Sequence, residues 1–167
     1  MQLEKLTLMK KIIPIFIILI VFFFDRGSKA YLINLQNSGT DIDFYINSYL
    51  NFYLVWNTGI GFGLASMEAG TYYHILTLII IMVNILLIFF LIKSKGYYSY
   101  FLALVIGGSL GNLYDRVNFY AVPDFIDLHI SKFHWFIFNV ADIFITTGII
   151  GLVLAELLKK GKISEDS

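Results

Sequence analysis

The chain has 167 residues with 12 basic and 12 acidic side chains, so its formal net charge at pH 7 is zero, and it has no cysteine. The scattered lysines form no concentrated basic surface for nucleic acid, and without cysteine there are no disulfides, thiol nucleophiles or thiolate metal sites. Hydrophobic residues make up 58% of the chain and aromatic residues 17%, more than a water-soluble domain carries. The composition therefore predicts an integral membrane protein.

Four runs of mostly apolar residues are expected to form membrane-spanning helices, because a span needs roughly 20 such residues. The runs cover about 12–32, 72–92, 97–113 and 136–158. The first run contains Asp25-Arg26-Gly27-Ser28-Lys29 where a signal peptide would have a small-residue cleavage site, so we expect it to remain as a helix. No linker or repeat divides the chain, which predicts one membrane domain over 1–160 and a disordered cytoplasmic tail over 161–167.

Basic residues indicate the orientation of these helices, because they gather on the cytoplasmic side of a membrane. Eight of them fall on one side of a four-span arrangement: Lys5, Lys10, Lys11, Lys93, Lys95, Lys159, Lys160 and Lys162. We therefore expect both termini in the cytoplasm and the segments 34–70 and 117–135 on the outer side.

The first outer segment is partly typical of β-strands. Residues 52–56 are aromatic or branched, and Asn57-Thr58-Gly59 after them is a plausible turn. The predicted fold is thus an all-α membrane protein with four transmembrane helices and a small extracytoplasmic β-sheet. Trp56 and Trp135 lie in outer segments, where tryptophan commonly forms an interfacial belt.

Acidic residues near the predicted spans are the main anomaly, since a charge at membrane depth is expensive and usually has a function. They are Asp25, Asp115, Asp124, Asp127 and Asp142. Asp25 lies four residues before Lys29, which predicts an ion pair on one helical face, and Asp115 has Arg116 beside it as a candidate partner. Asp127 is interpreted as a solvated loop acid.

Asp124 and Asp142 have no obvious basic partner, and they flank the same outer loop. Two carboxyl groups in one site do not both ionise readily, so one can keep its proton while the other takes a proton from water. This pairing would allow peptide hydrolysis without a metal or a covalent nucleophile. The alternative is that each aspartate caps a helix or satisfies backbone groups.

Neighbouring polar residues could orient a substrate carbonyl, namely Asn112, Arg116 and Asn139. Asn84, in contrast, is interpreted as a contact between helices. Gly107, Gly108 and Gly111 are expected to allow close helix packing rather than phosphate binding, since no lysine follows them as in a phosphate loop.

Three histidines raise the question of a metal. His74, His129 and His134 could in principle join Asp124 or Asp127, but no HExxH pair is present and we expect no metal and no other cofactor. No serine lies in a GxSxG motif that would indicate serine catalysis.

Five ordered motifs cover nearly the whole chain: Asp25 to Lys29, Asn57 to Gly63, Gly107 to Arg116, Val122 to Asp127, and Phe138 to Asp142. With this order and topology the chain resembles the bacterial lipoprotein signal peptidases, the aspartic signal peptidase II family. The resemblance implies that Asp124 and Asp142 are the catalytic pair. It also implies supporting or substrate-binding roles for Asp25, Lys29, Asn57, Gly108, Asn112, Arg116, Asn139 and Ala141.

The resemblance further implies an enzyme of the bacterial inner membrane that cleaves prolipoproteins just before a diacylglyceryl-modified cysteine, in contact with membrane lipids. We expect a monomer. Arg26 stands where the family usually has glutamine, and Gly61 where alanine or serine is more usual. A segment over 59–70 could act as a mobile lid, and Pro123 should end the third helix before Asp124.

A second class of function also fits acids within membrane spans. In a small transporter or proton-relay subunit, Asp25, Asp115 and Asp142 would pass protons instead of hydrolysing a peptide. Such a protein should place acids at mid-membrane or on both sides, whereas these acids gather toward one face.

Overall fold

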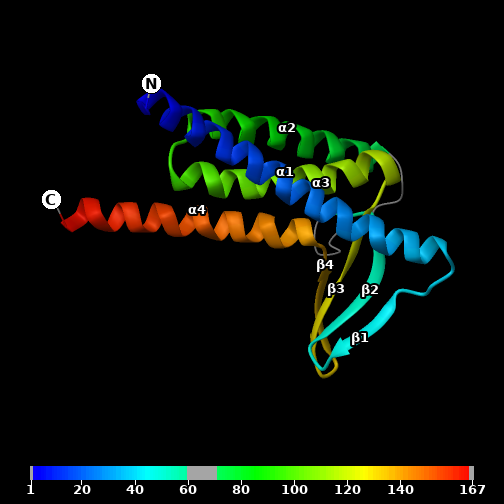
Figure 1. Cartoon of the computed structure of the whole chain (residues 1–167). Coiled ribbons are helices and arrows are strands. Elements are labelled where there is room, and N and C mark those ends of the chain that lie inside the picture. Colours follow the sequence, from blue (N-terminus) through cyan, green and yellow to red (C-terminus); the bar gives the residue numbers. More distant parts are fainter. Residues whose placement is uncertain (1, 60–70, 166–167) are drawn as a thin grey trace.

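The computed structural model describes residues 2–59 and 71–165. Its four helices are α1 (Gln2–Asn37), α2 (Thr71–Lys93), α3 (Tyr97–Phe119) and α4 (Val140–Glu165). The N-terminus, the C-terminus and the α2–α3 connection lie at one end of the helices, while the strands lie at the other end (Figure 1). This alternation of helix directions is the one that the lysine pattern predicts.

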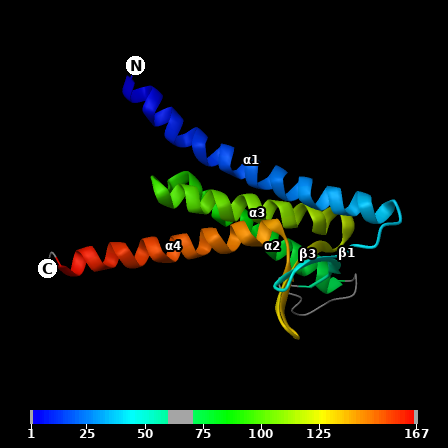
Figure 2. The ribbon, with the colours of Figure 1, turned by 60° about the horizontal axis from the view of Figure 1, so that its bottom comes forward.

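Helix α3 occupies the centre of the bundle and contacts α1, α2 and α4. Figure 2 shows α1 and α4 spreading apart toward the chain termini, while they approach α3 near the sheet. Gly107 and Gly108 make close approach possible, because a Cβ at Gly107 would lie 2.8 Å from the Cβ of Val21 and one at Gly108 would lie 2.5 Å from the carbonyl oxygen of Ala141. The close-packing interpretation of these glycines is confirmed.

The outer surfaces of the helices are strongly apolar. In the part of the chain that the structure describes, two stretches are long and apolar enough to cross a membrane, Tyr73–Lys93 and Val140–Lys159. Side chains such as Met82 and Leu157 are about 60% exposed, which suits contact with lipid rather than water. Helices α1 and α3 carry charged residues in their second halves and are not among these two stretches. The presence of four membrane spans therefore remains a prediction.

A four-stranded antiparallel sheet lies at the far end of the bundle, with the order β1 (Asp43–Asn47), β2 (Leu50–Asn57), β3 (Val122–Ile130) and β4 (Phe133–Phe138). The predicted strand at 52–56 is confirmed within β2. The fourth helix begins at Val140 instead of about residue 136, because residues 133–138 pair with β3. Helix α4 continues to Glu165, beyond the expected domain end at 160, and the disorder of the tail stays a prediction.

A small apolar core joins the sheet to the helices. Leu32, Ile42, Phe125 and Val140 are buried together where α1, β3 and α4 meet. Burying each such side chain contributes about 1.5–3 kcal/mol to stability. This core fixes the start of β3 against the start of α4, which brings Asp124 and Asp142 to the same end of the bundle.

Candidate active site

Asp124 is the third residue of β3 and is only 3% exposed. Helix α3 ends at Phe119, and Tyr120 follows with a left-handed backbone, so the helix stops before Asp124 as Pro123 predicted. The carboxylate accepts hydrogen bonds from the side-chain amides of Asn57, at 2.8 Å, and Asn139. Two neutral donors from two different elements therefore fix its position.

Asp142 lies in the first turn of α4 and forms a reciprocal cap with Asn139. The backbone N–H of Asp142 donates to Oδ1 of Asn139 at 3.2 Å, and the backbone N–H of Asn139 donates to Oδ2 of Asp142 at 3.1 Å. This arrangement is a capping box, which satisfies two otherwise unpaired donors at the helix start. The capping interpretation therefore holds for Asp142, and Asn139 contacts both acids.

Asn112 approaches Asp142 from α3. Its Nδ2 donates to Oδ1 of Asp142 at 2.8 Å, and its Oδ1 accepts a hydrogen bond from Nζ of Lys29 at 2.8 Å. Asn112 thus connects the candidate pair to α1.

A buried charge cluster of Asp25, Arg26, Lys29 and Asp115 lies behind Asn112. Lys29 is fully buried and donates to Asp25 at 2.9 Å and to Asp115 at 2.8 Å. The predicted ion pair of Asp25 with Lys29 is confirmed. The predicted partner of Asp115 is wrong, because Arg26 and Lys29 bind Asp115 instead of Arg116. Consecutive residues on a helix do not face each other, which explains the error.

Asp25 also reaches the start of α4, where its Oδ1 accepts from the backbone N–H of Ala141 at 2.9 Å. The first N–H groups of a helix have no partner within the helix, and this end of the helix carries a partial positive charge. A carboxylate there is therefore stabilised by the hydrogen bond and by the helix dipole. Gly108 and Gly111 leave room for this contact, since a Cβ at Gly111 would lie 2.5 Å from Oδ2 of Asp25.

Arg116 turns away from Asp115 and toward the outer segment. Its guanidinium donates to the carbonyl oxygen of Gly59 at 2.8 Å, and the N–H of Gly59 donates to Oδ1 of Asn57 at 2.9 Å. Tyr73, which the sequence did not single out, is 1% exposed and donates to the carbonyl oxygen of Arg116 at 3.2 Å. A tyrosine at the start of an apolar helix was the only signal for this role. The lid expected over 59–70 lies, after Gly59, outside the described residues.

All ten predicted site residues therefore belong to one connected region around Asp124 and Asp142. The pKa of Asp124 is raised to about 6, mainly by burial and secondly by the charge of the nearby Asp142. The amides of Asn57 and Asn139 oppose this rise by stabilising the carboxylate. Such an arrangement can hold a single proton between two carboxyl groups up to a pH of about 6.

Asp127 does not fit its sequence-based interpretation. It is 4% exposed within β3 and accepts from His134 at 2.9 Å, so it is not a solvated loop acid. Asn84 behaves as expected, because its Nδ2 donates to Ser109 on α3 at 2.8 Å and joins two helices.

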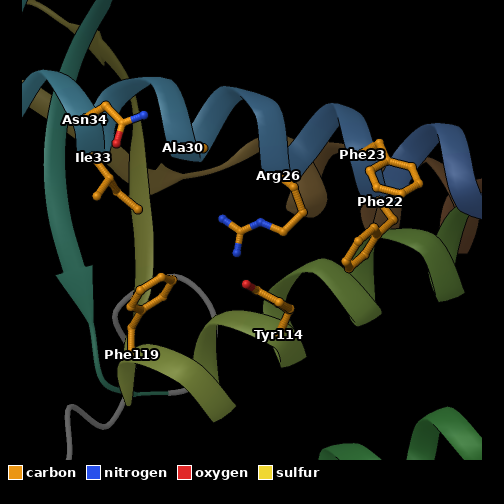
Figure 3. Close-up of a pocket in the computed structure, with 8 residues that line it drawn as sticks. All are labelled: Phe22, Phe23, Arg26, Ala30, Ile33, Asn34, Tyr114 and Phe119. Atoms are coloured by element: carbon orange, nitrogen blue, oxygen red, sulfur yellow. The ribbon is translucent and has the colours of Figure 1, made fainter.

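A groove of about 440 Å³ lies between α1 and α3 (Figure 3). It is lined by Phe22, Phe23, Arg26, Ala30, Ile33, Asn34, Tyr114 and Phe119. The guanidinium of Arg26 lies 4.7 Å from the centre of the Tyr114 ring within it. Neither Asp124 nor Asp142 lines this groove, so we do not assign the chemistry to it.

An apolar helical bundle with Asp124 buried and Asp142 partly buried at one end is the arrangement expected of a membrane peptidase that uses two acids. Residues 17–158 match the family model described as signal peptidase (SPase) II. The chain belongs to this family and is therefore a peptidase.

Similar proteins agree with this placement. A lipoprotein signal peptidase of Pelagibacter ubique is 46% identical over 95% of this chain and 96% of its own length, and that of Anaplasma phagocytophilum is 41% identical over 93% and 98%. Two solved bacterial membrane enzyme structures are similar in fold. One has a TM-score of 0.73 at 31% identity, covering 89% of this chain and 90% of its own, and the other has 0.69 at 33% identity, covering 86% and 92%.

Proposed function

We propose that Asp124 and Asp142 form the catalytic pair of this peptidase. The observation that carries the proposal is their shared partner, since Asn139 bonds the carboxylate of Asp124 through its side chain and that of Asp142 through its backbone. Both acids also accept amide donors from elsewhere, Asn57 and Asn112 respectively.

The pair would hold one proton at rest. The ionised carboxylate takes a proton from a water molecule, and the resulting hydroxide oxygen bonds to the carbonyl carbon of the scissile peptide. The protonated carboxyl donates a hydrogen bond to the carbonyl oxygen, where negative charge develops. When the tetrahedral intermediate collapses, the C–N bond breaks and the proton passes to the leaving amine.

The remaining site residues would position this pair. Lys29 and Asp25 hold Asn112 and Ala141, Gly108 allows α4 to approach α3, and Arg116 with Asn57 holds the strand beside Asp124. Asn57 and Asn112 also have amide groups that could bind the substrate backbone once it enters.

We propose that the substrate is a prolipoprotein carrying diacylglyceryl on its cysteine, and that cleavage occurs just before that cysteine. The relatives named lipoprotein signal peptidase support this substrate class. The position of the acids supports it too, because they lie where the sheet meets the ends of the apolar helices. Acyl chains between those helices would hold the peptide bond at this level.

The same proposal places the protein in the bacterial inner membrane as a monomer with four spans and one domain over 1–160. Its termini would face the cytoplasm and the sheet the outer side. The common position of both termini in Figure 1 and the lysines at that end support this orientation.

The decisive experiment follows cleavage of a synthetic prolipoprotein peptide bearing diacylglyceryl-cysteine, in detergent micelles. Asp124→Asn and Asp142→Asn should each abolish nearly all turnover while the fold is retained. Asp43→Asn, which makes the same change at an exposed aspartate on β1, should leave turnover unchanged. Activity in either of the first two variants would refute the pair, and an inactive but folded intact protein would favour the proton-relay alternative.

A further inference from the structure

The β3–β4 hairpin carries three side chains of kinds that can bind a metal ion. Asp127, His129 and His134 each offer one ligand atom, and these atoms lie within 4.8 Å of one another. His129 and His134 are directly paired across the two strands, so the hairpin register itself brings the imidazoles together.

Both imidazoles face the same carboxylate. Nδ1 of His134 lies 2.9 Å from Oδ2 of Asp127, and Nδ1 of His129 lies 3.7 Å from the same oxygen. The two rings are stacked with their centres 5.0 Å apart and their planes 26° from parallel. Three candidate ligand atoms from two strands therefore lie close together.

His129 supplies a second, independent observation. Its side chain is 9% exposed, and its Nδ1 has no hydrogen-bond partner among the described residues. A buried polar atom without a partner is rare and requires an explanation. Asp127 is buried as well, and in the described part of the chain its ion pairs are with these two histidines only.

We propose that Asp127, His129 and His134 bind a divalent transition-metal ion, with Zn²⁺ the best match. Zinc takes imidazole nitrogen and carboxylate oxygen at about 2.0–2.2 Å, so tetrahedral ligand atoms lie ~3.4 Å apart. The two separations from Asp127, 2.9 and 3.7 Å, lie on either side of this value, and the separation between the two histidine ligand atoms is within 4.8 Å. Three protein ligands leave the fourth position to water.

This assignment departs from the expectation of no metal. The sequence allowed His129 and His134 to join Asp127 but has no HExxH pair, which places two histidines one helical turn apart. Here the ligands are spaced two and five residues apart along a hairpin. The side chain of His134 is 55% exposed, which gives the ion a path to the site.

The ion would join β3 to β4 three residues after Asp124. Because Asp124 lies on β3, the metal would stiffen the strand that holds it, without touching the reacting atoms. The ion would therefore stabilise the hairpin, and this effect can be measured without an assay of peptidase activity.

The test is a calorimetric titration with Zn²⁺ of the full chain in detergent, purified without a polyhistidine tag and stripped with chelator. The intact protein should bind one ion per chain, and its melting temperature should be higher with Zn²⁺ than without it. His134→Gln and His129→Gln should each weaken binding at least ~10-fold, since loss of even an outer supporting partner costs that much.

His74→Gln is the matched control, because His74 lies on α2 and is the only histidine of the chain outside the group. It should bind Zn²⁺ like the intact protein. His134→Gln changes an exposed side chain, so it should fold even if His129→Gln does not. Absence of stoichiometric binding, or binding that persists unchanged in His134→Gln, would overturn the proposal.

Discussion

The side-chain amide of Asn112 donates to Oδ1 of Asp142 over 2.8 Å, and Lys29 fixes the direction of this bond. The ammonium of Lys29 can only donate, so the atom of Asn112 that lies 2.8 Å from it is the oxygen. The NH₂ group of Asn112 therefore points at Asp142. Lys29 on α1 thus determines that Asn112 on α3 presents its NH₂ group to Asp142 on α4.

Replacing Asn112 tests this relationship. Asn112→Ala should lower kcat/KM about 10-fold to 100-fold, because a hydrogen bond to a charged group contributes about 1.5–3 kcal/mol. Asn118→Ala, on the same helix but exposed, removes an amide whose one hydrogen bond within the described residues is to the carbonyl oxygen of Tyr114, and it should have no effect. Equal activities of the two variants in the micellar peptide assay would show that Asn112 does not act on Asp142.

The pH dependence follows from the raised pKa of Asp124. A carboxyl group with a pKa of about 6 is protonated below that pH and loses its proton as the pH rises through it. Since the proposed mechanism needs one proton on the pair, kcat/KM should fall as the pH rises above about 6.

Asn57 provides a check on this sign. Its hydrogen bond to Asp124 lowers the pKa of that carboxyl group. In Asn57→Ala the pKa should therefore be higher, and the alkaline fall in kcat/KM should move to higher pH. A shift toward lower pH would contradict the assignment of this limb to Asp124.

Lys29 should matter for stability as well as for the site. Lys29→Met leaves the buried carboxylates with one positive partner, Arg26, and should destabilise the protein by about 3–5 kcal/mol, as breaking a buried ion pair does. Adding Asp25→Asn restores a neutral charge cluster and should recover part of that loss. Unfolding in mixed detergent micelles would measure both, and a double variant less stable than Lys29→Met would contradict the charge argument.

Gly108 should not tolerate a methyl group. A Cβ there would lie 2.5 Å from the carbonyl oxygen of Ala141, so Gly108→Ala must push α3 and α4 apart, at a cost of about 1–3 kcal/mol. Gly27 is also within a helix, but a Cβ there would have no atom within 4 Å. Gly27→Ala should be neutral or stabilise by up to about 1 kcal/mol. Similar stabilities of the two variants would contradict this account.

The proposed orientation can be read with single cysteines, because the chain has none of its own. A membrane-impermeant maleimide should label Lys132→Cys, in the β3–β4 turn, on right-side-out inner-membrane vesicles. It should label Lys95→Cys, between α2 and α3, on inside-out vesicles only. The reverse pattern would mean that the sheet faces the cytoplasm.

Hydrophobic runs were sufficient to predict the helices, and the helix stop before Asp124 followed from Pro123. The strands β3 and β4 were missed because Asp124 and Asp127 within β3 are typical of a polar loop. Only pairing with β2 and β4 buries these acids, and pairing between distant segments has no local signal.

The residues of the candidate site could be predicted from the sequence, but most of the bonds between them could not. The four-residue spacing of Asp25 and Lys29 indicated their ion pair directly. The bonds of Asp115 to Arg26 and of Arg116 to Gly59 depend on how α3 is rotated against α1 and the outer segment. That rotation is set by packing of the whole bundle.

The contact of Asp25 with the N–H of Ala141 spans 116 positions of the chain. At a synthesis rate of about 5–20 residues per second, the partner of Asp25 emerges from the ribosome on the order of ten seconds later. Asp142 is made one residue after Ala141, so no shorter nascent chain contains a complete pair. With the catalytic pair proposed above, the order of translation delays hydrolysis until residue 142 has been made, so α4 is the helix that completes the proposed site.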